Sequence, residues 1–407
     1  MKLFKSLLVA PATLGLLAPI SATANELNLN DVSGYSSSEE VQNINEFYPK
    51  ELAVTNSRVD GLEVRMNDFE AGSFSTTTSA SFGADFVVGA VDGGSSEALT
   101  FEYQYGMNLS TSFSGEDTLA LTIETGNGTS PVATALDMNG MSDAMTLDGI
   151  SYTFPLGDKT TVMVGDSTDV SALYSTACTY AAFTDRLGDC GTGTSAGLGG
   201  GTADQDTTAT SDDASSATIA AAYDFGNGFT VAGGMSGAGG DSAGLFTKKS
   251  LDVYGLQAAY NTDSYGLSVS YALTEGHNFA TEHPDNGYDT TFWGLNGFYS
   301  FDDPSLPSIS VGYEAEDRGN STDPNYPALE KSGFFVGLTW DEVGPGSFST
   351  GLSSVANYQD TETEYYQYEA AYSYPVNDGM TVTPGVFIKE TSGDDETGVI
   401  VTTSFSF

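Results

Sequence analysis

From Phe74 to the end of the chain, apolar residues alternate with polar or small residues at a period of two. In the segment 101–109 every second residue is apolar, and the residues between them are Glu, Gln, Gly and Asn. Successive side chains of a β-strand point to opposite faces, so the pattern predicts strands with one apolar and one polar face. Sixteen such strands are predicted, near 74–91, 98–113, 117–124, 146–155, 160–166, 216–226, 228–236, 250–260, 264–274, 288–301, 307–316, 332–342, 346–357, 364–375, 380–390 and 397–407.

The lengths of these strands and of their connections favour a membrane barrel over a soluble sandwich. Many strands have about 9–12 residues, and a tilted strand needs about 9–11 to cross a bilayer. Short turns such as Asn377-Asp378-Gly379 alternate with long acidic connections such as 167–215. That alternation is typical of outer-membrane barrels. We therefore expect an all-β fold, a 16-stranded antiparallel transmembrane β-barrel over residues 72–407, with a soluble acidic β-protein as the alternative.

The first 71 residues are expected to form three segments. Residues 1–24 have the features of a cleaved signal peptide: basic Lys2 and Lys5, an apolar run and an A-x-A site. Residues 25–48 are acidic and are expected to be extended. In 49–71 apolar residues recur at three- and four-residue spacing, which predicts a short coiled-coil helix or, alternatively, an ordinary linker helix. No later stretch has 18 consecutive apolar residues, so no transmembrane helix is predicted.

The charge is strongly acidic, with a net value of −43 from 55 acidic and 12 basic residues. Nucleic acids and anionic lipid surfaces select basic proteins, so both are excluded as partners. Five charged residues fall on the faces expected to line a pore: Glu102, Glu124, Glu314, Glu369 and Lys389. Acids outnumber bases among them, which favours cations. The alternative is that these acids are simply solvated.

Cys178 and Cys190 are the two cysteines of the chain. An exported protein meets an oxidising compartment, so a disulfide is expected between them. The ring that it closes carries Asp185, Arg186 and Asp189. We expect this part of the long connection to fold into the pore and narrow it; the alternative is a surface loop clipped by the bridge.

The last strand alternates cleanly and ends on phenylalanine, with Phe405 and Phe407 on one face. This ending is typical of the signal that outer-membrane assembly machinery reads. No nucleophile or metalloprotease motif occurs, and the two histidines, His277 and His283, share one acidic connection. No catalytic residue, cofactor or metal is therefore expected, and an enzyme is not predicted.

Several segments resemble the cyanobacterial outer-membrane porins related to carbohydrate-selective porins, which are also labelled iron-uptake porins. The similar segments are 30–42, 58–63, 74–78 and the stretch 171–180 with the second cysteine. The resemblance implies a sixteen-stranded porin, a homotrimer, that passes carbohydrates or inorganic ions including iron. Members usually carry an S-layer-homology domain before the coiled coil. Here Phe47-Tyr48-Pro49 leads almost directly into the heptad region, so that domain is expected to be missing.

These features together predict a passive diffusion channel for ions and small hydrophilic solutes in the outer membrane. Its expected partners are outer-membrane lipid, the assembly machinery and copies of itself. The alternative is a structural barrel that serves as an envelope tether or surface adhesin.

Overall fold

The computed structural model describes residues 77–192, 216–238, 245–246, 252–275, 289–319, 328–360 and 362–407. The expected signal peptide, acidic segment and coiled-coil helix lie outside the described residues, as do the two histidines. The barrel domain predicted for 72–407 is described from residue 77 onward.

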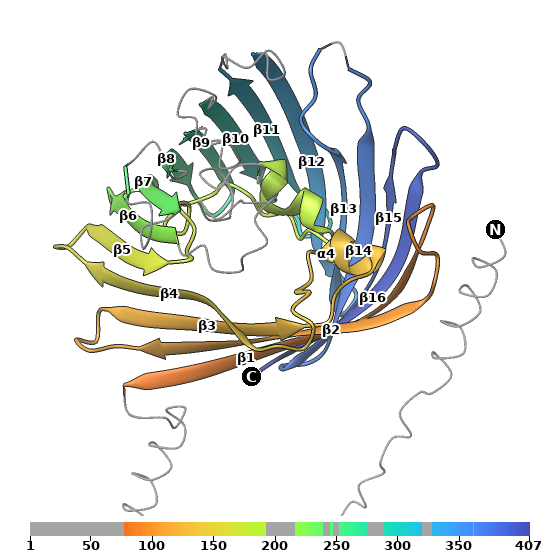
Figure 1. The fold of residues 1–407 in the computed structure, drawn as a ribbon, viewed down its shortest axis with the longest axis horizontal. Helices are drawn as coiled ribbons and strands as arrows, with labels where there is room; N and C mark the ends of the chain where they lie inside the picture. Colours follow the sequence, from red (N-terminus) through yellow and green to blue (C-terminus); the bar gives the residue numbers. More distant parts are fainter. Residues whose placement is uncertain are drawn as a thin grey trace, which may run out of the picture. The chain divides into compact units, whose positions relative to one another are not determined.

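The described residues form sixteen antiparallel strands that close into one barrel, as the alternation predicts. Each strand pairs with its neighbours in sequence, and the last pairs with the first (Figure 1). The strands are β1 (Thr78–Asp92), β2 (Thr100–Thr111), β3 (Thr118–Gly126), β4 (Thr146–Pro155), β5 (Thr160–Asp166), β6 (Ser216–Asp224), β7 (Phe229–Ala238), β8 (Asp252–Asn261), β9 (Tyr265–Thr274), β10 (Thr290–Tyr299), β11 (Ser308–Arg318), β12 (Leu329–Val343), β13 (Gly346–Ser354), β14 (Tyr366–Asn377), β15 (Met380–Lys389) and β16 (Glu396–Ser406).

The final residue closes the ring of strands. The backbone N–H of Phe82 in β1 donates to the Phe407 carbonyl at 2.8 Å, and the Phe407 N–H donates back to Phe82 at 3.1 Å. Their rings lie 6.1 Å apart, and those of Phe86 and Phe405 lie 5.9 Å apart. The aromatic ending of the chain therefore completes both the hydrogen-bond ladder and an aromatic cluster across the seam between β1 and β16.

The two faces of the strands differ in the way that their sequences predict. In β14 Tyr368 is 42% exposed on the outer face, whereas its neighbour Glu369 is 3% exposed on the inner face. Outward Phe86, Val88 and Val401 are likewise exposed apolar residues. An apolar outer surface and a polar inner surface are the arrangement expected of a barrel whose outside meets lipid.

The two ends of the barrel differ in their connections. Short connections join each even-numbered strand to the next, and several are tight turns. Between β4 and β5, for example, Leu156 N–H donates to Thr160 O and Gly157 takes a φ of 74°. The long connections and two short helices belong to the opposite end. We call the end of the barrel with the short connections the short-turn end, and the opposite end the long-loop end. Among the described residues, no helix is long and apolar enough to cross a membrane.

Two helical segments lie inside the ring of strands (Figure 1). The helix α4 (Pro131–Leu136) belongs to the connection between β3 and β4, and the 3-10 helix η3 (Asp185–Gly191) belongs to the connection between β5 and β6. The alternation analysis misses α4, although Ser130 followed by Pro131 is a common helix start. Ser130 caps it by accepting the N–H groups of Val132 and Ala133.

Candidate functional site

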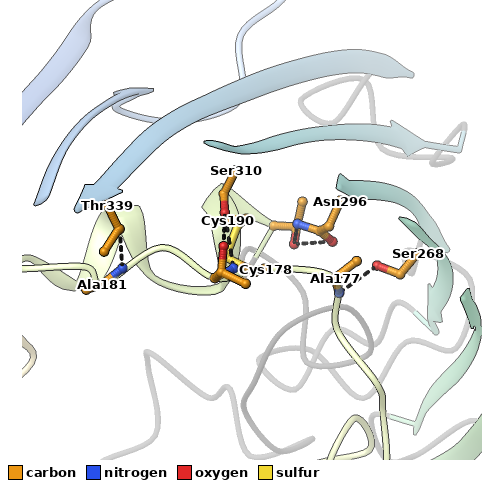
Figure 2. The surroundings of a disulfide bond; sticks show 10 residues. Ala177, Cys178, Ala181, Cys190, Ser268, Asn296, Ser310 and Thr339 are labelled. Carbon is orange, nitrogen blue, oxygen red and sulfur yellow. Dashed lines mark hydrogen bonds between the residues drawn. A yellow bond between two sulfur atoms is a disulfide. The ribbon is translucent and has the colours of Figure 1, made fainter. Parts of the chain in front are cut away.

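An extended segment of the β5–β6 connection follows the inner wall of the barrel from β8 to β14. Every second residue donates its backbone N–H to an inward side chain of a wall strand. The donor and acceptor pairs are Ser175 with Gln257, Ala177 with Ser268, Thr179 with Ser310, Ala181 with Thr339, and Phe183 with Glu369, at 2.7, 3.3, 3.1, 3.2 and 2.8 Å. Figure 2 shows three of these contacts around the disulfide. We call residues 171–192 the constriction segment.

The spacing of two has a simple cause. In an extended chain successive N–H groups point in opposite directions, so residues 175, 177, 179, 181 and 183 present theirs to the same side. The wall supplies hydroxyl, amide and carboxylate oxygens on that side because the inward positions of its strands are polar. The segment is thus bound by a series of individual hydrogen bonds and not by a β-ladder. A buried extended segment of this kind needs such partners for its backbone.

Glu369 binds the end of the segment with four donors. Its carboxylate accepts the N–H of Phe183 at 2.8 Å, the N–H of Thr184 at 2.9 Å and the phenol of Tyr180 at 2.9 Å. The Thr184 hydroxyl also donates to it, and Gln367 in turn donates to that hydroxyl at 2.7 Å. Four donors from three residues of the segment thus converge on one side chain. Glu369 is therefore the principal anchor of the constriction segment.

Burial changes the pKa values of two side chains in the constriction segment, Tyr180 and Arg186. Burial, together with the nearby Glu369 carboxylate, raises the pKa of the Tyr180 phenol well above its ordinary value. The phenol therefore stays neutral, and its O–H donates a hydrogen bond to Glu369. Burial also lowers the pKa of Arg186, an effect that the neighbouring Glu314 opposes. Arginine nevertheless remains charged at any ordinary pH.

The helix η3 turns the segment back, and a disulfide joins the two arms. Cys178 and Cys190 are bonded, with Cα atoms 6.0 Å apart (Figure 2). The buried Leu187 and Cys190 pack on Phe335 of β12. Thr192 then exchanges hydrogen bonds with Asn296 of β10 at 3.2 and 3.1 Å. The expected disulfide is therefore present, and both arms of its ring are bound to the wall.

Glycines on the inner face make room for this segment. A Cβ at Gly351 in β13 would lie 2.7 Å from both Leu187 Cδ2 and Tyr180 Oη. At Gly312 in β11 it would collide with the Cys190 carbonyl, and at Gly385 in β15 with the Phe183 ring. The wall is therefore shaped for the segment as well as bonded to it.

A second connection enters the barrel from the opposite side. Glu102 of β2 is 5% exposed and accepts the N–H groups of Thr129 and Ser130 at 2.9 and 3.0 Å. The Ser130 hydroxyl, which caps α4, also donates to Glu102. Farther along the connection, Asn139 donates to Glu124 of β3 at 2.7 Å. Two inward glutamates thus fix the segment that carries α4.

Apolar contacts complete the docking of α4. Val132, Ala133 and Met138 form a buried cluster with inward residues of three wall strands: Val87 and Val91 of β1, Phe387 of β15 and Ile400 of β16. Apolar side chains on the inner face of a barrel are unusual where water fills the lumen. Here they are covered by α4, so this part of the wall belongs to a packed core.

The five charged residues that the sequence singles out all lie in strands of the barrel wall, in different surroundings. Glu102, Glu314 and Glu369 are at most 5% exposed. Their carboxylates bind loop groups, as Glu314 binds Asn357 Nδ2 at 2.6 Å. Residues of the connections cover these three carboxylates, so each lies against protein groups on the inner side of the wall. Glu124 is half-buried, and half-buried Lys389 pairs with Glu396 at 3.3 Å.

The charged residues of the disulfide ring lie in η3. Asp185 is exposed, and Arg186 donates from Nε to the Ser354 carbonyl at 2.8 Å. Asp189 belongs to the same helix.

The sequence analysis did not identify four wall side chains that accept hydrogen bonds from the constriction segment: Gln257, Ser268, Ser310 and Thr339. Each occupies an inward position of its strand, and that position is the signal that could have identified them.

A cavity of about 340 Å³ opens between α4 and η3 at the long-loop end. Thr134 and Ala135 of α4 line one side, Asp185 and Arg186 of η3 another, and Lys389 and Glu396 the wall. Among the described residues, no cluster of three or more His, Cys, Asp or Glu is arranged to hold a metal ion.

Comparisons with known proteins bear on the fold. No protein-family model matches the chain. A protein of Nostoc sp. (strain PCC 7120) named "Uncharacterized protein alr4550" is 37% identical over 92 residues, which are 22% of this chain and 16% of that protein. The match thus spans a small share of that relative's length.

Solved structures of outer-membrane proteins are similar over most of the chain. Pseudomonas putida OprB matches with a TM-score of 0.58 and 12% identity, over 86% of this chain and 97% of that one. A loop-deletion mutant of OmpT, an outer membrane protein of Vibrio cholerae, matches with a TM-score of 0.55, 12% identity and coverage of 81% and 99%. A substituted Rh. blastica porin gives a TM-score of 0.50, 19% identity and coverage of 81% and 100%. The fold is therefore that of the outer-membrane porin barrels.

Proposed function

We propose that this protein is an outer-membrane porin, a passive diffusion channel for ions and small hydrophilic solutes. The observation that carries the proposal is the constriction segment. A segment that follows the inner wall of a closed barrel, bonded to β8, β9, β11, β12 and β14, would narrow a passage through that barrel. Selection in such a channel comes from pore width and from the charges at the narrowest point.

The membrane location is supported by the apolar outer face and by the porin fold of the solved neighbours. We propose export by the N-terminal signal peptide and assembly through the C-terminal Phe405 and Phe407. In this orientation the long-loop end faces outward and the short-turn end faces the periplasm. Assembly as a homotrimer, with the coiled-coil segment on the periplasmic side and without an S-layer-homology domain, is part of the same proposal.

We propose a mild preference for cations. The net charge of −43 attracts cations to the mouths of the barrel. Inside, half-buried Glu124 and exposed Asp185 contribute negative charge to the passage, whereas Glu102, Glu314 and Glu369 act as anchors. Carbohydrates and inorganic ions including iron are the proposed solutes, by resemblance to the carbohydrate-selective porins.

Planar-bilayer recordings test this function. Purified, folded protein should insert in discrete conductance steps, and a KCl gradient should give a reversal potential on the cation-selective side. Folded protein that produces no steps would exclude a channel. An anion-selective reversal potential would exclude the charge argument and leave the channel itself standing.

A further inference from the structure

The cavity between α4 and η3 brings opposite charges together in an otherwise acidic protein. Lys389 of β15 and Glu396 of β16 form an ion pair on the wall, with side chains 36% and 30% exposed. Asp185 and Arg186 line the same cavity from η3. Its volume of about 340 Å³ lies at the lower end of the range of small-molecule sites, roughly 300–1,000 Å³.

Arg186 is incompletely satisfied in this position. Its Nε donates to the Ser354 carbonyl at 2.8 Å, while its Nη2 is buried and has no hydrogen-bond partner among the described residues. A buried charged donor without an acceptor is costly, and native proteins seldom keep one without a reason. The Arg186 side chain lines the cavity, so its positive charge attracts a ligand carboxylate there, whereas the buried Nη2 itself lies out of a ligand's reach.

The other groups that line the cavity include charges of both signs. The Lys389 ammonium has three donors, of which Glu396 takes one. The Asp185 carboxylate is exposed and lines the cavity, and Thr129 and Thr134 add exposed side chains from the connection that carries α4. The cavity therefore offers cationic groups for a carboxylate and anionic groups for an ammonium within one small space.

We infer that this cavity binds a small zwitterion, a molecule of amino-acid type with one ammonium and one carboxylate group, on its way through the channel. The net charge of the protein and the charges at the site together favour a zwitterion over an anion or a cation. An anion has to enter the field of a chain with a net charge of −43, and a cation meets Arg186 and Lys389 at the site. A zwitterion has no net charge, so the long-range field does not oppose it, and both of its ends find partners.

The inference rests on the proposed channel function. Single-channel recording distinguishes a failure of the zwitterion site from a failure of the channel function. Four related three-carbon probes differ mainly in charge: L-serine is a zwitterion, glycerate an anion, serinol a cation and glycerol neutral. Each is added at matched ionic strength to wild-type channels in KCl. L-serine should reduce the open-channel current to a saturating level, and the other three should not do so at the same concentrations.

Two variants and one control locate the block. Lys389→Gln and Glu396→Gln each remove one charged hydrogen-bonding group, and each should raise the half-blocking concentration of L-serine about tenfold, the equivalent of about 1.4 kcal/mol. Lys159→Gln makes the same change at the short-turn end, where Lys159 bonds the Phe225 carbonyl. That variant should match the wild type, and all three should keep the wild-type heat-induced shift on SDS gels.

The outcomes are distinct. Channels without any current would overturn the proposed function. Working channels that L-serine does not block, or in which glycerol blocks equally, would overturn the zwitterion site alone. A stronger block by glycerate or by serinol would also overturn it, because the cavity would then select a single charge. An unchanged half-blocking concentration in Lys389→Gln would show that L-serine binds elsewhere.

Discussion

The carboxylate of Glu369 in β14 accepts the backbone N–H of Phe183 at 2.8 Å, which ties the constriction segment to the wall of the barrel. Three further donors, from Tyr180 and Thr184, reach the same carboxylate. A glutamate on a strand of the wall therefore fixes the end of this segment. The behaviour of the channel should depend on this anchor and on the groups that support it.

Replacement of Glu369 by alanine should loosen the constriction segment. The variant leaves the N–H groups of Phe183 and Thr184 without their acceptor, at a cost of about 1–3 kcal/mol for an unsatisfied buried group. We expect a larger and noisier single-channel conductance. Glu342→Ala, at an exposed position of β12, is the matched control. Identical conductance in the two variants would show that Glu369 does not hold the segment.

A methyl group at Gly351 should displace the segment from the other side. The added Cβ would lie 2.7 Å from Leu187 Cδ2 and from Tyr180 Oη, and overpacking of this kind typically costs about 1–3 kcal/mol. Gly351→Ala should lower the temperature at which the barrel unfolds on SDS gels and should alter the conductance. Gly106→Ala has only a contact at 4.0 Å and should change neither. Equal unfolding temperatures and equal conductances in the two variants would show that the constriction segment does not pack against Gly351.

Loss of the disulfide should affect stability more than conductance. The bridge closes a ring between residues 12 apart, and rings of about 15 residues contribute about 3 kcal/mol in chain entropy. The wall bonds of Ser175, Ala177 and Thr179 do not depend on the bridge. Cys178→Ser/Cys190→Ser should therefore keep a conductance close to wild type while unfolding at a lower temperature. A conductance as large as that of Glu369→Ala would mean that the bridge, and not the wall, holds the segment.

Asp117, in the turn before β3, should make barrel stability depend on pH. Hydrogen bonds from Ser114 and Tyr152 hold the pKa of Asp117 well below its ordinary value. A carboxyl whose pKa is depressed by folding stabilises the fold above its unfolded pKa, near 4, and that contribution is lost as the pH falls further. Asp117→Asn should therefore unfold at a lower temperature than wild type at pH 7, and the difference should shrink below about pH 4. A difference that is constant with pH would contradict this origin.

The barrel itself could be predicted because a period of two is a local property of the sequence. Residues such as Tyr368 and Glu369 differ so clearly in polarity that neighbours in sequence fix the face of each. The same parity assigns Glu102, Glu124, Glu314 and Lys389 to the interior. Turn residues such as Gly157 mark the short-turn end in the same local way.

The burial of these acids could not be predicted, because it depends on residues far away in the chain. Glu369 is covered by Tyr180, Phe183 and Thr184, which lie more than 180 residues earlier. No pattern near Glu369 distinguishes an anchor from an acid that faces water. The apolar character of the inward residues Val87 and Ile400 could not be interpreted from the sequence either, because it is explained by the docking of α4 against them.

Single-channel conductance with and without the constriction segment tests directly whether this segment narrows an open pore. In the variant, residues 171–192 are replaced by a glycine-serine linker, and folding is checked by the heat-induced shift on SDS gels. We predict stepwise conductance in both proteins and a several-fold larger step in the variant, because the interior next to β8–β14 becomes open to water and ions. Equal steps in the two proteins, or no steps from folded wild-type protein, would contradict the account.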